Sequence, residues 1–241
     1  MKLTNPLKAF GFVLLSICLC ASVIVAQDNR DRNTKKAREA AAQSARAARV
    51  FEQIMGTREK SIPQDLLDKA EAVAVFPGVW KGGFVVGGRR GSGVISRRIT
   101  NGWSAPAFFD LLGGSFGLQA GVASTDYILL FMNEHAVDSL LTDKVEIGGE
   151  GSAAAGPVGR SASASTDARL NAQILSYSRS KGAFAGLELK GVVIKPDNED
   201  NLHVYAMSAK DILTGNNKIP PEQISEGVRV FPETLGRYSK R

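Results

Sequence analysis

The pattern of apolar and polar positions divides the chain into a helical N-terminal part and a longer strand-rich part. Residues 33–55 contain no Pro or Gly and are rich in Ala, Arg and Glu, which favour helices. At 100° per residue, the basic side chains fall within about 80° of one another; they are Lys35, Arg38, Arg46 and Arg49. The other side carries Ala37, Ala40, Ala41, Ala48, Phe51 and Met55. We predict a helix with one cationic face and one weakly apolar face.

After this helix the apolar period changes from 3.6 to 2, which indicates half-buried strands. Alternation is clearest over 116–122, 145–147 and 187–190. Asn101-Gly102 lies between two strand-like runs, and this dipeptide is typical of a hairpin turn. The uniformly apolar run 127–132 predicts a strand that is covered on both faces.

Short helices are predicted between and after the strands. The pattern favours helices over 63–71 and 134–141, and two more over 198–207 and 220–231. Pro220 and Pro221 are expected to open the last of these.

Glycines are concentrated between Gly78 and Gly191, within the strand-rich region. Glycine inside strands marks bulges, tight bends and close backbone approaches. We therefore predict an α+β fold: a glycine-rich, strongly curved, mainly antiparallel sheet or small barrel, with an N-terminal helix and short C-terminal helices.

The first residues have the layout of an export signal. Lys2 and Lys8 precede an uncharged run from Ala9 to Ala26, and a polar stretch begins at Gln27. We expect residues 1–26 to be a signal peptide, 27–56 a basic helix, and 57–241 a β-rich domain.

Two alternatives to a cleaved signal peptide concern the same segment. The uncharged run from Ala9 to Ala26 is 18 residues long, so an uncleaved membrane anchor is one alternative. Both cysteines, Cys18 and Cys20, lie in this segment, which leaves lipoprotein modification as a further alternative. The expected location is the periplasm or the bacterial envelope.

The composition limits the kinds of partner and cofactor that the chain is expected to bind. The chain has a net charge of +6, and removal of residues 1–26 leaves 28 Lys and Arg against 24 Asp and Glu, or +4. A balance this mildly basic, on an exported chain, favours anionic membrane surfaces over nucleic acid. With two histidines and no cysteine after residue 26, nothing suggests a metal site or a cofactor.

Two glycine-rich segments resemble catalytic or phosphate-binding motifs but lack the required context. Residues 78–95 contain neither GxxxxGK[ST] nor GxGxxG, and a strand is expected where a phosphate-binding helix would begin. Residues 113–117 read GGSFG, which places Ser115 at the nucleophile position of GxSxG, followed in the chain by Asp126 and then His135 or His203. The residues after Ser115 alternate like a strand, whereas a nucleophile elbow needs a helix there. A serine hydrolase is therefore only a remote alternative.

Three basic residues lie in the first predicted strands: Lys81, Arg89 and Arg90. They are candidates for contact with an anionic surface. The competing interpretation is a solvated strand edge, which charged residues protect from unwanted pairing.

Four ordered blocks resemble the SYLF lipid-binding domain family. They read AVAVFPGVWKGGFVVGGRRGSGVI, NGWSAPAFFDLLGGSFGLQAGVASTDYILLFMN, GGEGSAAAGPVGR and ILSYSRSKGAFAGLELKGVVIKPDNEDN. The resemblance runs from about Arg49 to Leu213 and is strongest for bacterial exported members. It implies a non-enzymatic domain that associates with membranes. Eukaryotic members of the family are attracted to phosphoinositides, and some bind actin, through basic residues and an amphipathic N-terminal helix.

The residues and the resemblance together predict a peripheral protein that binds anionic phospholipids. The expected lipid-binding residues are Lys35, Arg38, Arg46, Arg49, Lys81, Arg89 and Arg90. The apolar face of the helix is mostly alanine, so it either lies shallowly on the membrane or packs on the domain's own sheet. The alternative function is a structural or interaction module that binds another envelope protein.

Overall fold

The computed structural model describes residues 33–57, 61–83, 86–100, 102–116, 121–142, 144–147, 153–159, 172–180, 183–186, 189, 191–215, 219 and 224–239. The chain divides into two units, Met1–Glu39 and Ala40–Arg241. The predicted segment 1–26 lies outside the described residues. Residues 33–55 are helical, as predicted.

The second unit is built on one sheet. Its strands are β1 (Ala72–Gly83), β2 (Val86–Ile99), β3 (Gly102–Trp103), β4 (Ala107–Phe116), β5 (Gly121–Phe131), β6 (Val145–Ile147), β7 (Ala153–Ala155), β8 (Ile174–Ser180), β9 (Ala183–Gly186) and β10 (Val192–Pro196). The helices are α2 (Gln64–Lys69), α3 (Glu134–Leu140), α5 (Asn198–Tyr205), α6 (Ala209–Thr214) and α7 (Glu226–Tyr238).

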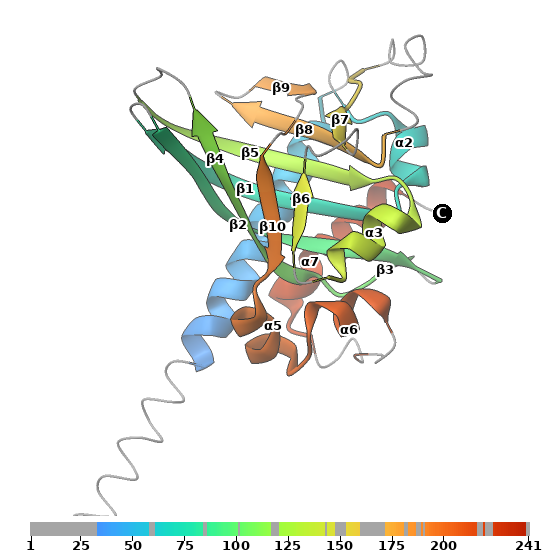
Figure 1. Ribbon diagram of the computed structural model, residues 1–241. Coiled ribbons are helices and arrows are strands. Elements are labelled where there is room, and N and C mark those ends of the chain that lie inside the picture. Colours follow the sequence, from blue (N-terminus) through green and yellow to red (C-terminus); the bar gives the residue numbers. More distant parts are fainter. Residues whose placement is uncertain are drawn as a thin grey trace, which may run out of the picture. The chain divides into compact units, whose positions relative to one another are not determined.

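The strand order is β6-β10-β4-β2-β1-β5-β8-β7, with β3 beside β2 and β9 beside β8. The pairing of β7 with β8 is parallel, and the other pairings described are antiparallel. Figure 1 shows the sheet curling strongly, so that it is nearly closed and barrel-like. The predicted α+β fold with a curved, mainly antiparallel sheet is confirmed.

The N-terminal helix packs into the core of this unit. Ala47, Phe51 and Ile54 are fully buried. Two buried polar side chains of the same helix are satisfied by distant backbone: Gln43 Nε2 donates to Gly93 O of β2 at 3.0 Å, and Ser44 Oγ donates to Val228 O of α7 at 2.7 Å. From Ala40 onward the apolar face is therefore covered by protein, which decides between the two placements predicted for it.

The helix α5 is fixed to β4 by its polar side chains. Asn201 accepts from the Phe108 amide at 2.8 Å and donates to the Phe108 carbonyl at 2.9 Å. The Tyr205 hydroxyl donates to Pro106 O at 2.8 Å, and burial raises the pKa of this phenol above its usual range. Burial also raises the pKa of Tyr177 in β8, and Asp65 adds to the effect.

Most predicted elements are present. Gly102 has φ +119° and joins β2 to β3, where Arg98 faces Trp103, as expected for a hairpin at 101–102. Residues 127–131 of β5 are buried on both faces. The predictions for 63–71, 134–141 and 198–207 correspond to α2, α3 and α5.

Of the predicted run 116–122, Phe116 lies in β4 and Gly121 in β5, and residues 117–120 lie outside the described residues. One predicted element needs correction. The last helix begins at Glu226 instead of near Pro220 and continues to Tyr238; its amphipathic pattern, with Val228, Phe231 and Leu235 buried, outweighs the start signal of the prolines. Leu187 lies outside the described residues.

Candidate functional site: a basic groove and a basic strand end

A groove of about 590 Å³ opens between the N-terminal helix and the sheet. The helix contributes Arg46, Arg49, Val50 and Gln53, and the sheet contributes Pro77, Gly78, Asp126 and Arg179. The helical residues recur at spacings of three and four, which place side chains on one face. Ala47, Phe51 and Ile54 take the buried face of the same helix, so burial of the apolar side holds both arginines toward the groove.

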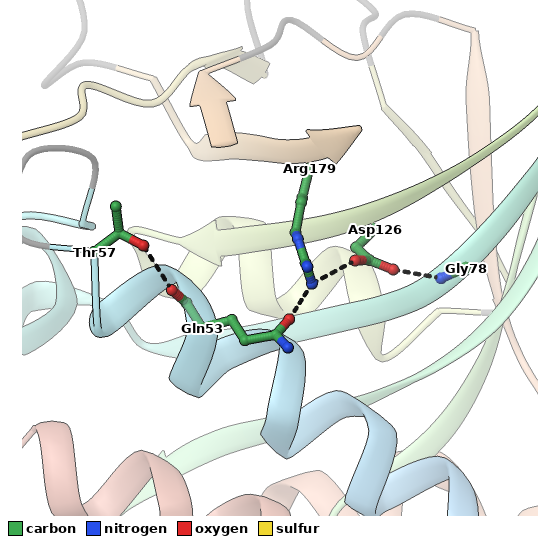
Figure 2. Close-up of polar contacts among 5 residues, drawn as sticks. All are labelled: Gln53, Thr57, Gly78, Asp126 and Arg179. Atoms are coloured by element: carbon green, nitrogen blue, oxygen red, sulfur yellow. Dashed lines mark hydrogen bonds and ion pairs between the residues drawn. The ribbon is translucent and has the colours of Figure 1, made fainter. Parts of the chain in front are cut away.

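The floor of the groove is an irregularity in β1. Phe76 pairs with Tyr127 and Val79 with Thr125, so Pro77 and Gly78 of β1 stand opposite Asp126 alone, and β1 accommodates one extra residue there. Gly78 has φ +62°, a conformation that glycine adopts without strain. The Gly78 amide donates to Asp126 Oδ1 at 2.8 Å (Figure 2). Asp126 thus satisfies a backbone donor of the irregular segment.

Arg179 of β8 links the sheet to the helix. Its Nη1 lies 3.5 Å from Asp126 Oδ2 and donates to the Gln53 side-chain carbonyl. Thr57 Oγ1 donates to Gln53 O at 3.0 Å near the helix end. Figure 2 shows the chain of contacts from Thr57 through Gln53, Arg179 and Asp126 to Gly78. Sequence reasoning missed Arg179 and Gln53, because neither stands in a motif.

The groove carries excess positive charge. Asp126 offsets Arg179, whereas Arg46 and Arg49 are exposed and make no ion pair or hydrogen bond with the described residues. Guanidinium groups bind phosphate and carboxylate oxygens in a bidentate manner. The groove is therefore suited to an anion.

Lys81, Arg89 and Arg90 lie near the end of the β1–β2 hairpin. Lys81 is directly opposite Arg89, and Arg90 is opposite Trp80. The edge-strand interpretation of these residues is wrong, because β1 is flanked by β2 and β5, and β2 by β1 and β4. Like charges directly opposite in a sheet are destabilising. Protection of a sheet edge thus does not explain them.

Lys35 and Arg38 belong to the first unit, where both are exposed. Lys35 Nζ lies 3.9 Å from Glu39 Oε1. Arg38 makes no ion pair with the described residues.

Other arginines have structural partners. Arg97 Nη2 contacts Glu134 Oε2 at 2.5 Å. Arg98 lies 4.1 Å from the centre of the Trp103 ring and donates to Ser239 Oγ at 2.6 Å. These arginines hold elements together, as Arg179 does, in contrast to Arg46 and Arg49 of the groove.

The serine-hydrolase alternative fails on backbone context. Ser115 lies within β4, in register with Gly87 of β2, and the strand continues to Phe116. His135 and His203 are exposed on α3 and α5. Among the described residues no group of three His, Cys, Asp or Glu side chains could hold a metal. In the same part of the chain, no helix is both long and apolar enough to span a bilayer.

The sequence of this chain is similar to that of known proteins. Residues 112–231 match the family model Ysc84, described as Las17-binding protein actin regulator. The chain belongs to the Ysc84/SYLF domain family. The resemblance that the sequence blocks suggested is confirmed, and members of this family are generally non-enzymatic adaptor or lipid-binding proteins.

Curated relatives support the assignment over most of the chain. Protein YSC84 of Saccharomyces cerevisiae is 36% identical over 196 residues, which cover 79% of this chain and 42% of the relative. LAS seventeen-binding protein 3 of the same species is 36% identical over 194 residues, or 78% of this chain and 41% of the relative. SH3 domain-containing YSC84-like protein 1 of Homo sapiens is 30% identical over 209 residues, or 83% and 61%. The Ysc84/SYLF chain thus spans about two-fifths to three-fifths of the length of these relatives.

Proposed function

We propose that this Ysc84/SYLF protein is a non-enzymatic peripheral membrane protein that binds anionic phospholipids through its basic residues, at the bacterial envelope after export. One observation carries the proposal: of the seven cations expected to contact lipid, six make no ion pair with the described residues. These are Arg38, Arg46, Arg49, Lys81, Arg89 and Arg90. Cations left without internal partners are available to an external anion.

The expected affinity follows from the charges. Each basic side chain near an anionic leaflet contributes about 1 kcal/mol. A few such contacts give weak, reversible binding that salt weakens, because exposed charges are screened over about 8 Å at physiological ionic strength. The covered apolar face of the helix argues against deep insertion of that helix.

Co-sedimentation with vesicles tests the proposal. We expect the chain from Gln27 onward to bind phosphatidylglycerol vesicles at low salt and to dissociate at high salt. Arg46→Glu together with Arg49→Glu should weaken binding by at least about tenfold, since two favourable contacts of about 1 kcal/mol each become repulsive.

The matched control reverses two other exposed cations, Lys195→Glu on β10 and Lys210→Glu on α6. It changes the net charge equally but leaves the groove intact, so we expect a smaller loss. Absence of binding to anionic vesicles even at low salt would refute the proposal.

A second candidate function is protein binding in the envelope. The observation that favours it is the description of the family as Las17-binding and as an actin regulator, which indicates that this domain type supports protein contacts in other members. Recovery of one envelope protein in a pull-down, unaffected by added phospholipid, together with no vesicle binding, would favour this function instead.

A further inference from the structure

Trp80 is one of three exposed large apolar side chains among the described residues, at 49% beside Ile99 and Leu202, and it is the aromatic one. The chain has two tryptophans, and the other, Trp103, is only 9% exposed and lies against the Arg98 guanidinium. Trp80 is also placed in an interior strand of the sheet, between β2 and β5. Its exposure is therefore not a consequence of a position at the margin of the sheet.

The Trp80 ring lies over its own strand. A Cβ atom built at Gly82 would fall 2.3 Å from Trp80 Cζ2 and 2.4 Å from Cη2. The ring thus lies across Gly82, two residues along on the same face of β1. Only glycine leaves room for it there. The absence of a side chain at Gly82 thus gives the indole a place over its own strand while the residue stays half exposed.

Cations lie on both faces of this strand end. Arg90 is opposite Trp80 across the β1–β2 pair and shares its face, whereas the next pair toward the hairpin end, Lys81 with Arg89, points to the other face. None of the three makes an ion pair with the described residues. An amphipathic indole beside unpaired cations is the combination that favours the headgroup region of an anionic bilayer.

The same face of the sheet leads to the basic groove. Ser124 of β5 is opposite Trp80, and Asp126 of the groove is two residues further along, on the same face of β5. The ends of β1, β2, β4 and β5 extend together at the upper left of Figure 1. Trp80 and the groove therefore belong to one surface.

We propose that this end of the β1–β2 strand pair is the part of the protein that enters the lipid interface, with Trp80 in the headgroup region, Arg90 at lipid phosphates on the same face, and Lys81 and Arg89 at lipid phosphates on the other face. The inference rests on the proposed lipid binding and adds the orientation of the bound protein. The occupant is an anionic leaflet, because the apolar contact is a single ring at a strand end that carries three cations without ion pairs among the described residues, whereas the core of a protein interface is depleted in charge.

Tryptophan fluorescence tests this orientation, since Trp103 serves as a buried internal reference. The unmodified chain is titrated with phosphatidylglycerol vesicles that contain brominated phosphatidylcholine, which quenches only indoles at the lipid. We expect a blue shift of the emission and quenching. In Trp80→Phe, which leaves Trp103 alone, both responses should be lost while the thermal unfolding transition is retained.

Co-sedimentation of the same samples tests lipid binding itself, separately from the orientation of the bound protein. Binding without any quenching of Trp80 would overturn the proposed orientation and leave lipid binding intact. Failure to bind the vesicles at all would overturn lipid binding itself and the orientation with it. Equal quenching of the unmodified chain and of Trp80→Phe would show that Trp103 reports instead, and would likewise reject the orientation.

Discussion

At the scale of single residues, glycines decide where strands and rings come close together. Gly93 of β2 is an example, because a Cβ there would lie 2.4 Å from both Phe76 Cδ1 and Val75 O. The carbonyl belongs to the paired strand β1 and cannot move without breaking the local ladder. In contrast, a Cβ at Gly114 of β4 would meet no heavy atom within 4 Å.

These two glycines give a matched pair of substitutions. Gly93→Ala should lower the free energy of unfolding by about 2 kcal/mol through overpacking, whereas Gly114→Ala should change it by less than about 0.5 kcal/mol. Urea unfolding followed by circular dichroism measures both. Equal effects of the two substitutions would show that the close approach at Gly93 is not a source of constraint.

At the scale of elements, the contact between Asp126 and Arg179 both fixes the groove and limits its charge. Asp126 joins β5 to the irregularity of β1 through Gly78, and Arg179 joins β8 to the helix through Gln53. An amide in place of the carboxylate can still accept from the Gly78 amide but no longer neutralises Arg179. Replacement of Asp126 by Asn therefore changes the charge of the groove but keeps an acceptor for the Gly78 amide.

Asp126→Asn should raise the affinity for phosphatidylglycerol vesicles about fivefold, because one more cation of the groove then acts on the leaflet with about 1 kcal/mol. Asp138→Asn on α3, an exposed position with the same change of charge, is the control and should have a smaller effect. Vesicle titration at low and high salt measures both. If the two variants gain equally, net charge and not the groove governs binding.

The sequence was informative about elements wherever periodicity and turn chemistry agree. The helix at 33–55, the hairpin at Gly102 and the buried strand at 127–131 follow from local patterns. The helix α6 and the strands β8 and β10 were not predicted, since their burial depends on partners far along the chain. Arg179 was missed for the same reason, because its role comes from Asp126 and Gln53, which lie 53 and 126 residues away in sequence.

The sequence indicated the shared face of the helical cations but not the arrangement of the strand cations. Arg46 and Arg49 were expected to share a helical face, and they line one groove. The sequence could not show that Lys81 and Arg89 oppose each other in interior strands. That placement depends on the register between β1 and β2 and on the order of the whole sheet.

At the scale of the whole molecule, the boundary of the compact unit lies within the N-terminal helix. The second unit begins at Ala40, and Ala47, Phe51 and Ile54 are fully buried in it. This part of the helix thus belongs to the core of the sheet domain, in addition to carrying two arginines of the groove. Removal of the helix would expose apolar surface of the sheet as well as remove charge.

Two truncations should therefore behave differently. A chain that starts at Ala40 should keep a cooperative thermal transition, whereas one that starts at Thr57 should lose it. Loss of the Phe51 side chain alone is expected to cost about 3–5 kcal/mol, a large part of the 5–15 kcal/mol that stabilises a typical domain. Differential scanning calorimetry measures both chains, and a cooperative transition in the shorter chain would contradict this role of the helix.

The order of the strands also bears on how the chain is made. The four central strands β4, β2, β1 and β5 are complete once synthesis reaches Phe131, but their outer neighbours β8 and β10 come only at 174–180 and 192–196. Until then β4 and β5 each present an unpaired backbone to other chains, a state that promotes aggregation. The nascent protein thus passes through an interval in which the backbone edges of two central strands, β4 and β5, have no partner from its own later strands.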